Sequence, residues 1–450
     1  MKEHLYTAVF LMGLSISVQA AVTSEEAKRL GSDLTPLGAL KAGNDDGSIP
    51  PWEGGLKNSP KNYVENKHMV NPFSEDLPLR EITASNYKEH EKYLSEGQKA
   101  LLTSYPDTYK IRVLPTRRTA HVPISVQEKS IANATTSQLI NEGNSVVNYD
   151  SYYPFPIPEN AYEVLWNHLL RYRGGSLFRE QDQLVVESNG AFRPVRIEET
   201  AVFPENLVGY DFEKDSNTMI YVKQRIKAPA RLTGTILLVH ETKDQVIQPR
   251  KSWVYNSGQR RVRRAPQVGY DSPGTASDGL RTTDQVDMYS GAPDRYEWSL
   301  EGKHELFVPY NNYQLSDPNI KYKDLVLKNH LNPDFLRYEK HRVWKVVGKL
   351  KEGTRHIYSK RVMYIDEDTW QILSVDHYDN KGNLWKVSEG FHVQYYYAET
   401  PWLAGEAVYD LTNKRYIVTG LQNEVAAPIK FGFKMNKGEF TPAAIRRLGK

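Results

Sequence analysis

The feature that most constrains this fold is a long succession of strand-like segments joined by turns, from about residue 183 to residue 419. Several joints carry β-hairpin turn residues, as in Asn256–Gln259, Asp366–Asp368 and Asp379–Asn383. Consecutive hairpins give an antiparallel meander, and no long helical pattern separates the strands, which argues against a doubly wound α/β fold. The expected strands are Gln183–Glu187, Met219–Ile226, Leu232–Glu241, Lys251–Tyr255, Arg260–Ala265, Tyr296–Leu300, Glu305–Pro309, His341–Leu350, Arg355–Ile365, Trp370–Tyr378, Leu384–Val387, Val393–Tyr397 and Arg415–Thr419.

The strands are apolar on both faces. In Arg355–Ile365, for example, Tyr358, Val362 and Tyr364 alternate with Ile357, Met363 and Ile365. A sheet with one face in water would alternate more cleanly between apolar and polar residues. We therefore expect that each face of the sheet is covered, or that one face is the wall of a cavity.

Helices are expected at four places outside the meander, the first a short helix that opens with the capping box Thr23–Glu26 and runs through Leu30. Ala84–Tyr105 has a helical pattern that Pro106 ends, and Asn160–Tyr172 begins with the capping pair Asn160 and Glu163. Thr441 and Pro442 open a terminal helix. Residues 34–62 are rich in Gly, Pro, Asn and Asp without any period, which predicts an ordered but irregular arm.

The first twenty residues have the layout of a cleavable secretion signal. Leu5–Val18 is an uncharged apolar run too short to span a membrane, and Val18-Gln19-Ala20 offers small residues for a signal peptidase. The chain has no Cys, which excludes disulfides, Cys-ligated metals and the acylated Cys of a bacterial lipoprotein. We expect an exported, soluble and unlipidated protein, periplasmic if the host is Gram-negative.

No sequence motif points to catalysis or to nucleic acid. The formal net charge of +3 is too small to imply a nucleic-acid partner. Nucleophile-elbow, phosphate-loop, dinucleotide-binding and zinc-protease motifs are all missing from the sequence. We therefore expect a protein that is not an enzyme and that uses no cofactor and no metal.

Two segments stand out as candidate interaction sites. Arg250–Arg264 carries six basic and no acidic residues on a predicted hairpin. The candidates on this hairpin are Arg260, Arg261, Arg263 and Arg264. They either bind lipid phosphates or an acidic partner, or they form a solvated face that is paired with acids elsewhere. Gly269–Gly291 is long, polar and rich in turn residues. It is either a binding loop or lid, with Asp278, Arg281 and Asp284 as polar candidates, or a well-packed connection.

Four ordered blocks resemble one known family: LGSDLTPLGALKAGNDDGSIPPWEGGL, IPENAYEVLWNHLLRYRGGS, the run from SWVYNSGQRRVRR to GAPDRYEW, and RHIYSKRVMYIDEDTWQILSVDHYDNKGNLWKVSE. The family consists of exported bacterial proteins catalogued as domain of unknown function 1329, and it is similar in fold to the LolA/LolB lipoprotein carriers. The resemblance implies a strongly curved antiparallel half-barrel with helices on its concave side. It also implies an apolar cavity, which in the carriers holds acyl chains.

The fold class expected is therefore mainly β (α+β): a LolA-like curved antiparallel half-barrel with an irregular N-terminal extension. Residues 1–20 are the expected signal peptide, residues 21–150 an arm and helical segment that packs on the main domain, and residues 151–450 the LolA-like domain. The expected cavity wall, chosen by strand position, consists of Tyr221, Leu237, Val239, Trp253, Tyr255, Trp344, Tyr364, Leu373 and Trp385.

Three functions remain open from the sequence. The main hypothesis is a periplasmic carrier for a lipid or other hydrophobic molecule, working with an envelope transporter or outer-membrane protein. The alternatives are a non-enzymatic interaction module of an envelope or export complex, and a hydrolase of a hydrophobic substrate built on the Gly269–Gly291 loop. Fold alone does not decide among them.

Overall fold

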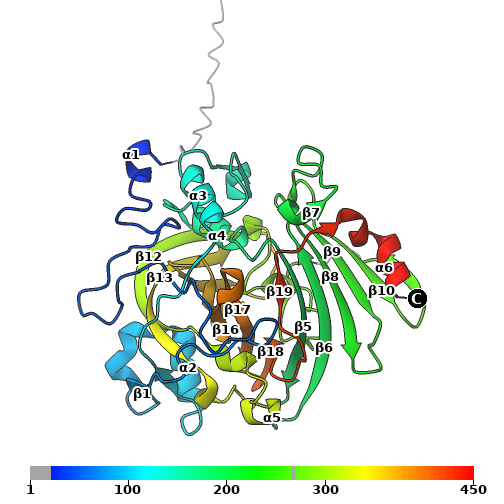
Figure 1. The fold of residues 1–450 in the computed structure, drawn as a ribbon. Helices are drawn as coiled ribbons and strands as arrows, with labels where there is room; N and C mark the ends of the chain where they lie inside the picture. Colours follow the sequence, from blue (N-terminus) through cyan, green and yellow to red (C-terminus); the bar gives the residue numbers. More distant parts are fainter. Residues whose placement is uncertain (1–21, 266–268, 450) are drawn as a thin grey trace, which may run out of the picture.

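The computed structural model describes residues 22–265 and 269–449 (Figure 1). The predicted signal segment therefore lies outside the described residues. Among those residues, no helix has the length and hydrophobicity needed to cross a membrane. The α-helices are α1 (Ser24–Ala27), α2 (Glu96–Ser104), α3 (Ile124–Asn133), α4 (Ala161–Leu169), α5 (Tyr322–Leu325) and α6 (Pro442–Leu448).

The strands of the main sheet are β1 (Arg80–Ile82), β2 (Ile111–Val113), β5 (Ser176–Val186), β6 (Phe192–Val202), β8 (Thr218–Ala228), β9 (Ile236–Thr242), β10 (Lys251–Asn256), β11 (Arg261–Arg264), β12 (Tyr296–Pro309), β13 (Tyr338–Leu350), β14 (Lys360–Asp366), β15 (Ile372–Tyr378), β16 (Leu384–Tyr395), β17 (Thr400–Asp410), β18 (Arg415–Leu421) and β19 (Lys430–Phe431). Two small separate sheets pair β3 (Gln138–Ile140) with β4 (Ser145–Val147), and β7 (Leu207–Val208) with β20 (Met435–Asn436).

Two antiparallel meanders make up the main sheet. One runs from β5 through β11, the other from β12 through β18, and pairing of β18 with β5 joins them. The outermost strands, β11 and β12, do not pair with each other in the described part of the chain, so the sheet stays open. This confirms the expected mainly β fold with one large sheet; the only parallel pairing within it is the short contact of β2 with β13.

The predicted helices are found with one correction, and α3 was not predicted from the sequence. Asn160 caps α4 by accepting from the Glu163 amide (3.1 Å), and Thr441 caps α6 in the same way. The expected helix over residues 84–105 is wrong as one element, because Ser95 interrupts it. Ser95 forms a capping box with Gln98, so a 3-10 helix (Tyr87–Tyr93) ends before it and α2 begins after it.

Two central strands were missed by the sequence prediction. β6 contains Pro194 and the pair Glu198-Glu199, and β17 contains Pro401 and Gly405, all residues that β-propensity disfavours. Each strand nevertheless lies between two long partners, which supply the pairing that its own composition does not favour. Pairing with neighbouring strands, and not local propensity, therefore determines that both segments form strands.

Helices lie on both faces of the sheet, whose two-sided strands predicted either that each face is covered or that one face is the wall of a cavity. On one face, α4 contacts β12 and β13. On the other face, α2 contacts β15 and β16, and α6 packs on β9, β10 and β11, as the red helix at the end of the green strands in Figure 1 shows. A single large core joins α2, α4 and the second meander.

Candidate functional site

A row of facing side chains across the first meander defines the concave face of the sheet. Arg179 of β5 pairs with Glu199 of β6, Glu199 with Gln224 of β8, and Gln224 with Leu237 of β9. Directly paired residues point to the same side of a sheet. These four residues line one cavity together with Trp402 of β17, so the sheet curves around that side.

The cavity on this concave face has a volume of about 180 Å³. Its apolar wall comes from the strands and from the loop opposite them: Leu177, Ile197, Ala201, Ile220, Val222, Leu237, Val239 and Val286. Phe203 and Met219 are shared with a second cavity of about 250 Å³ at one end, and Thr275 is shared with a third of about 880 Å³ at the other. The concave face of the first meander therefore carries three adjoining hollows.

The Gly269–Gly291 loop forms the opposite wall of the central cavity. Asp287 accepts from Arg171 and Arg173, each at 2.5 Å, and from the Trp402 indole at 3.0 Å. These neighbours hold the pKa of Asp287 well below its usual range despite its burial. The loop is therefore fixed in place by buried ion pairs.

Helix α4 holds the same loop from the side of the second meander. Burial lowers the pKa of His168 to about 3, so its ring is neutral. Its Nε2 donates to the carbonyl oxygens of Asp287 (3.1 Å) and Tyr289 (3.2 Å), and its Nδ1 accepts from the Ile372 amide (3.3 Å). Beneath the second meander the concave side is thus filled by α4 and the loop.

Buried arginine–carboxylate pairs surround the central cavity. Arg179 pairs with Glu199 at 2.8 Å and Arg250 with Glu241 at 2.6 Å. Glu406 of β17 accepts from the Met288 amide (3.0 Å), and burial raises its pKa to about 7. Arg281 also lines the cavity, and burial lowers its pKa.

The structure divides the predicted wall residues of the first meander between the two faces. Leu237 and Val239 line the central cavity. Tyr221, Trp253 and Tyr255 lie on the opposite face, where they pack with Phe440 and Ile445 of the C-terminal segment. Those three residues therefore do not form the expected wall, because their side chains are out of phase with Leu237 and Val239 along the strands.

The predicted wall residues of the second meander are packed against protein. Trp344 stacks on Trp370 with ring centroids 6.2 Å apart, and Trp385 packs edge-on against Tyr358. Tyr364 and Leu373 belong to a separate buried cluster with Val343. None of the four lines the central cavity.

The three polar loop candidates point to different places. Arg281 faces the central cavity and Asp278 the third hollow, where it pairs with Arg415 at 3.2 Å. Asp284 is buried and pairs with Arg361 at 2.7 Å and with His356 at 3.3 Å. They form no common site, and the predicted loop-based hydrolase site is not assembled from them.

The basic hairpin lies at an open edge of the sheet. Arg260, Arg261, Arg263 and Arg264 are exposed on and beside β11. Within residues 22–265 and 269–449, none of these four arginines has an acidic partner within 4.0 Å, so the predicted pairing with acids elsewhere is not found there. Arg250, from the same run, is instead buried in the cavity wall with Glu241.

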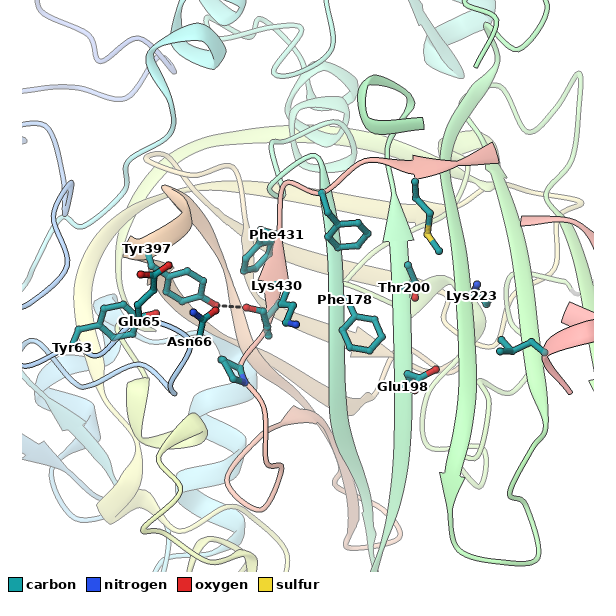
Figure 2. A pocket seen from close by; sticks show the side chains of 15 residues that line it. Tyr63, Glu65, Asn66, Phe178, Glu198, Thr200, Lys223, Tyr397, Lys430 and Phe431 are labelled. Carbon is teal, nitrogen blue, oxygen red and sulfur yellow. Dashed lines mark hydrogen bonds between the residues drawn. The ribbon is translucent and has the colours of Figure 1, made fainter. Parts of the chain in front are cut away.

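A further hollow of about 710 Å³, the outer hollow, lies on the opposite, outer face of the first meander (Figure 2). Figure 2 shows Phe178, Thr200 and Lys223 on neighbouring strands, with Phe431 and Tyr397 beside them. Tyr397 donates to the Ile429 carbonyl at 2.8 Å, which holds the C-terminal segment over β5. Thr200 pairs with Lys223 in the register, so this hollow lies on the face opposite Glu199 and Gln224.

One group of buried residues has the composition of a metal site. Ligand atoms of His341, Asp366 and Asp368 lie within 4.8 Å of one another. Asp368, however, already accepts two hydrogen bonds from Arg118, at 2.9 and 2.6 Å. A guanidinium bound to one of the three residues opposes a second cation there, so the group is best explained as a buried ion network.

Comparison with known proteins identifies the family. The model of the family described as "Protein of unknown function (DUF1329)" matches residues 81–446. The chain belongs to this family. It is also 51% identical over 446 residues to the uncharacterized protein PA3922 of Pseudomonas aeruginosa, covering 99% of this chain and 98% of that protein. The resemblance inferred from the sequence is confirmed.

Solved structures with weaker similarity were also found. A DUF1329 protein from Desulfovibrio piger has a TM-score of 0.42 at 16% identity, covering 60% of this chain and 92% of that one. A putative outer membrane lipoprotein-sorting protein domain from Vibrio parahaemolyticus has a TM-score of 0.41 at 14% identity (61% and 92%). The LolA superfamily protein NE2245 from Nitrosomonas europaea has a TM-score of 0.38 at 11% identity (63% and 98%).

Several cavity residues of this DUF1329 protein escaped the sequence analysis. Arg179, Gln181 and Gln183 alternate along β5, a spacing that places all three on one face. Glu199 faces the cavity, while the adjacent Glu198 points to the opposite face of the sheet. Trp402 and Glu406 carried no signal because β17 itself was not predicted.

Proposed function

We propose that this DUF1329 protein is a non-enzymatic periplasmic carrier that binds a lipid or other hydrophobic molecule on the concave face of its first meander. The observation that carries this proposal is the half-buried state of Val222, Leu237 and Val239. These residues lie on β8 and β9, which are paired on both sides, yet they face a cavity instead of packed protein. Apolar side chains in such a position favour an apolar occupant.

The size of the cavity suits part of a hydrophobic ligand. An apolar cavity of about 150 Å³ accommodates benzene in an engineered protein, and the central cavity has about 180 Å³. The two adjoining hollows extend it in both directions along the strands. A ligand there would gain about 25 cal/mol for each Å² of apolar surface removed from water.

The periplasmic location rests on the amino-terminal sequence. Residues 1–20 have the layout of a cleavable signal, and the chain has no Cys that could be acylated. A carrier that diffuses between membranes needs both properties. Cell fractionation with amino-terminal sequencing of the mature protein tests this part: the new terminus should follow Ala20, and a membrane-bound, uncleaved protein would contradict it.

The binding proposal is tested with protein purified from its own host. Native mass spectrometry should detect a co-purifying hydrophobic molecule, and an apolar fluorescent probe should bind and be displaced by lipid. Val239→Trp fills the central cavity, so it should reduce probe affinity at least about tenfold. Met435→Trp is the matched control because Met435 lines the outer hollow of Figure 2.

Three outcomes decide the binding proposal. Loss of binding in Val239→Trp with normal binding in Met435→Trp supports it. Loss in Met435→Trp alone transfers the site to the outer face and contradicts it. The absence of both a co-purifying molecule and probe binding in the wild-type protein rejects the carrier role.

The exposed arginines of β11 support a second element of function, docking to a negatively charged envelope transporter or outer-membrane protein. An open strand edge offers unpaired backbone groups, and Arg261 and Arg263 add charge without an acidic partner in the described residues. The double variant Arg261→Glu/Arg263→Glu should slow ligand transfer to envelope vesicles from the host. Its probe affinity should be unchanged, and an unchanged transfer rate would argue against docking there.

A further inference from the structure

Arg281 differs from every other arginine of the central cavity. Arg173 is paired with Asp287, Arg179 with Glu199 and Arg250 with Glu241. The Arg281 guanidinium has no carboxylate within 4.0 Å and donates no hydrogen bond to any residue of the described chain. Its Nε is buried without a hydrogen-bond partner, as are those of Arg173 and Arg250, so the missing carboxylate is what distinguishes Arg281.

The position of Arg281 is fixed by its own loop. Its carbonyl oxygen accepts from the Gly274 amide (2.8 Å) and from the Ser277 hydroxyl (3.2 Å). The preceding residue, Leu280, is buried in a cluster with Val408 and Ile417. The following residue, Thr282, forms a capping box with Gln285. The backbone on both sides is therefore held, and the side chain is directed into the cavity by a rigid segment.

The sheet on the far side of the cavity also holds this segment. The Gln183 amide donates to the carbonyl oxygens of Thr275 (3.1 Å) and Ala276 (2.7 Å). These bonds bridge the loop and β5 between the central cavity and the third hollow. Arg281 thus lies in a preformed pocket, which lowers the cost of ordering a ligand there.

The charges around Arg281 do not neutralise it. Glu199 is engaged by Arg179 and accepts from Gln224 as well. Glu406 is the other nearby acid, and burial raises its pKa to about 7, so it carries only part of a charge at neutral pH. Asp287 is shared by two arginines, Arg171 and Arg173. Arg281 is therefore the arginine of this cavity whose charge is matched by no carboxylate within 4.0 Å in the described chain.

Arg281 is half-buried with its Nε fully buried, so its charge loses part of its hydration, and proteins rarely keep a desolvated charge without a compensating anion. Here the apolar wall of Ile220, Val222, Leu237 and Val239 belongs to the same cavity as the guanidinium. Guanidinium groups bind carboxylate and phosphate in a bidentate manner. The cavity thus combines one anion-binding group with an apolar surface.

We infer that the ligand is an anionic amphiphile whose carboxylate or phosphate head group pairs with Arg281 while its chain lies on the apolar wall of β8 and β9. This inference rests on the proposed carrier function and adds the chemical class of the ligand. It specifies the head group and the apolar character of the chain but not the chain length, because the central cavity shares lining residues with a hollow at each end.

The test compares ligands that share one chain and differ in head group. Dodecanoate, dodecyl phosphate and dodecanol are titrated by calorimetry into the full-length mature protein below their aggregation concentrations. The wild-type protein should bind the two anions at least about tenfold more tightly than the alcohol. In Arg281→Gln this preference should disappear while dodecanol affinity stays the same, and Arg281→Lys should retain part of it.

Lys223→Gln is the matched control, since Lys223 is a half-buried cation in the hollow on the other face of the same sheet. It should leave the preference intact; loss of the preference in this variant would overturn the inference. Equal binding of all three ligands by the wild type would also overturn it, while leaving the carrier function standing. Binding of none of them would instead reject the carrier function. A preference for only one of the two anions identifies the head group.

Discussion

The two meanders differ most on their shared concave side. Beneath the second meander, α4 and the Gly269–Gly291 loop fill the space, and residues such as Met363 and Val375 are fully buried. Beneath the first meander, Leu237 and Val239 occupy equally central strands but remain half-buried against a cavity. One continuous sheet therefore has a packed half and an open half.

The loop carboxylates are matched by buried arginines on both sides of the loop. Asp284 pairs with Arg361 in the packed half, and Asp287, which lines the central cavity, pairs with Arg171 and Arg173. Arg281, which faces the open half, has no such partner in the described chain. The ion pairs of Asp284 and Asp287 thus fix the loop in place, while Arg281 of the same loop faces the cavity. The packed half therefore holds the cavity wall of the open half rigid.

The largest expected effect comes from breaking the ion pairs that fix the loop. Asp287→Asn keeps the size of the side chain but leaves Arg171 and Arg173 without a carboxylate, so it should lower the free energy of unfolding by about 3–5 kcal/mol. Denaturant titration followed by fluorescence measures the loss. Asp278→Asn is the control, because Asp278 forms an exposed pair with Arg415; its effect should stay below about 1 kcal/mol. Equal effects of the two variants would contradict the anchoring role.

A matched pair of leucines tests the packed and open halves directly. Leu165 of α4 is completely buried, so Leu165→Ala should cost about 2–5 kcal/mol through lost burial and the cavity left behind. Leu237 already faces a cavity, so Leu237→Ala should cost less than about 1 kcal/mol, since little packing is lost. Both values come from denaturant titration. Similar losses at the two positions would show that the open half is as tightly packed as the other.

The sequence predicted the architecture better than the individual strands. Hairpin residues such as Asn256–Gln259 mark local turns, and the short apolar segments between such turns indicate strands even where both faces are covered, so the meanders could be recognised. β6 and β17 could not, because their proline, glycine and glutamate residues are tolerated only through pairing with neighbours. The expected helix is interrupted at Ser95 because the Ser95 side chain accepts a hydrogen bond from the Gln98 amide, and this local bond competes with continuation of the helix.

The site was less predictable than the fold. Leu237 and Val239 were identified, but Tyr221, Trp253 and Tyr255 were assigned to the same wall, because strand position alone does not fix which face a side chain takes. Arg281 was singled out within a polar loop, while its difference from Asp284 could not be read from the sequence. That difference depends on Arg361 and His356, which are more than seventy residues away along the chain.

The pH dependence of stability gives a third test, centred on Glu406. Its pKa is raised to about 7 in the folded protein, against about 4.3 for an unperturbed glutamate. Folding therefore favours the protonated form, and the penalty grows as pH rises from about 4.3 and levels off above 7. Glu406→Gln should stabilise the protein by up to about 3 kcal/mol at pH 8 and have almost no effect at pH 4. A pH-independent difference would place Glu406 outside the low-dielectric cavity.

The smallest expected effect is also the one that separates binding from packing. Arg281→Met removes an unpaired cation from the cavity, so the free protein should gain about 1 kcal/mol of stability. With saturating dodecanoate the order should reverse, since a ligand that binds only the folded state raises its stability, and the wild type binds the anion more tightly. Thermal unfolding of both proteins, with and without ligand, measures this crossover. If Arg281 served packing alone, Arg281→Met would lower the stability of the protein both with and without ligand. If Arg281 serves binding, its unpaired charge lowers the stability of the wild type only when the cavity is empty.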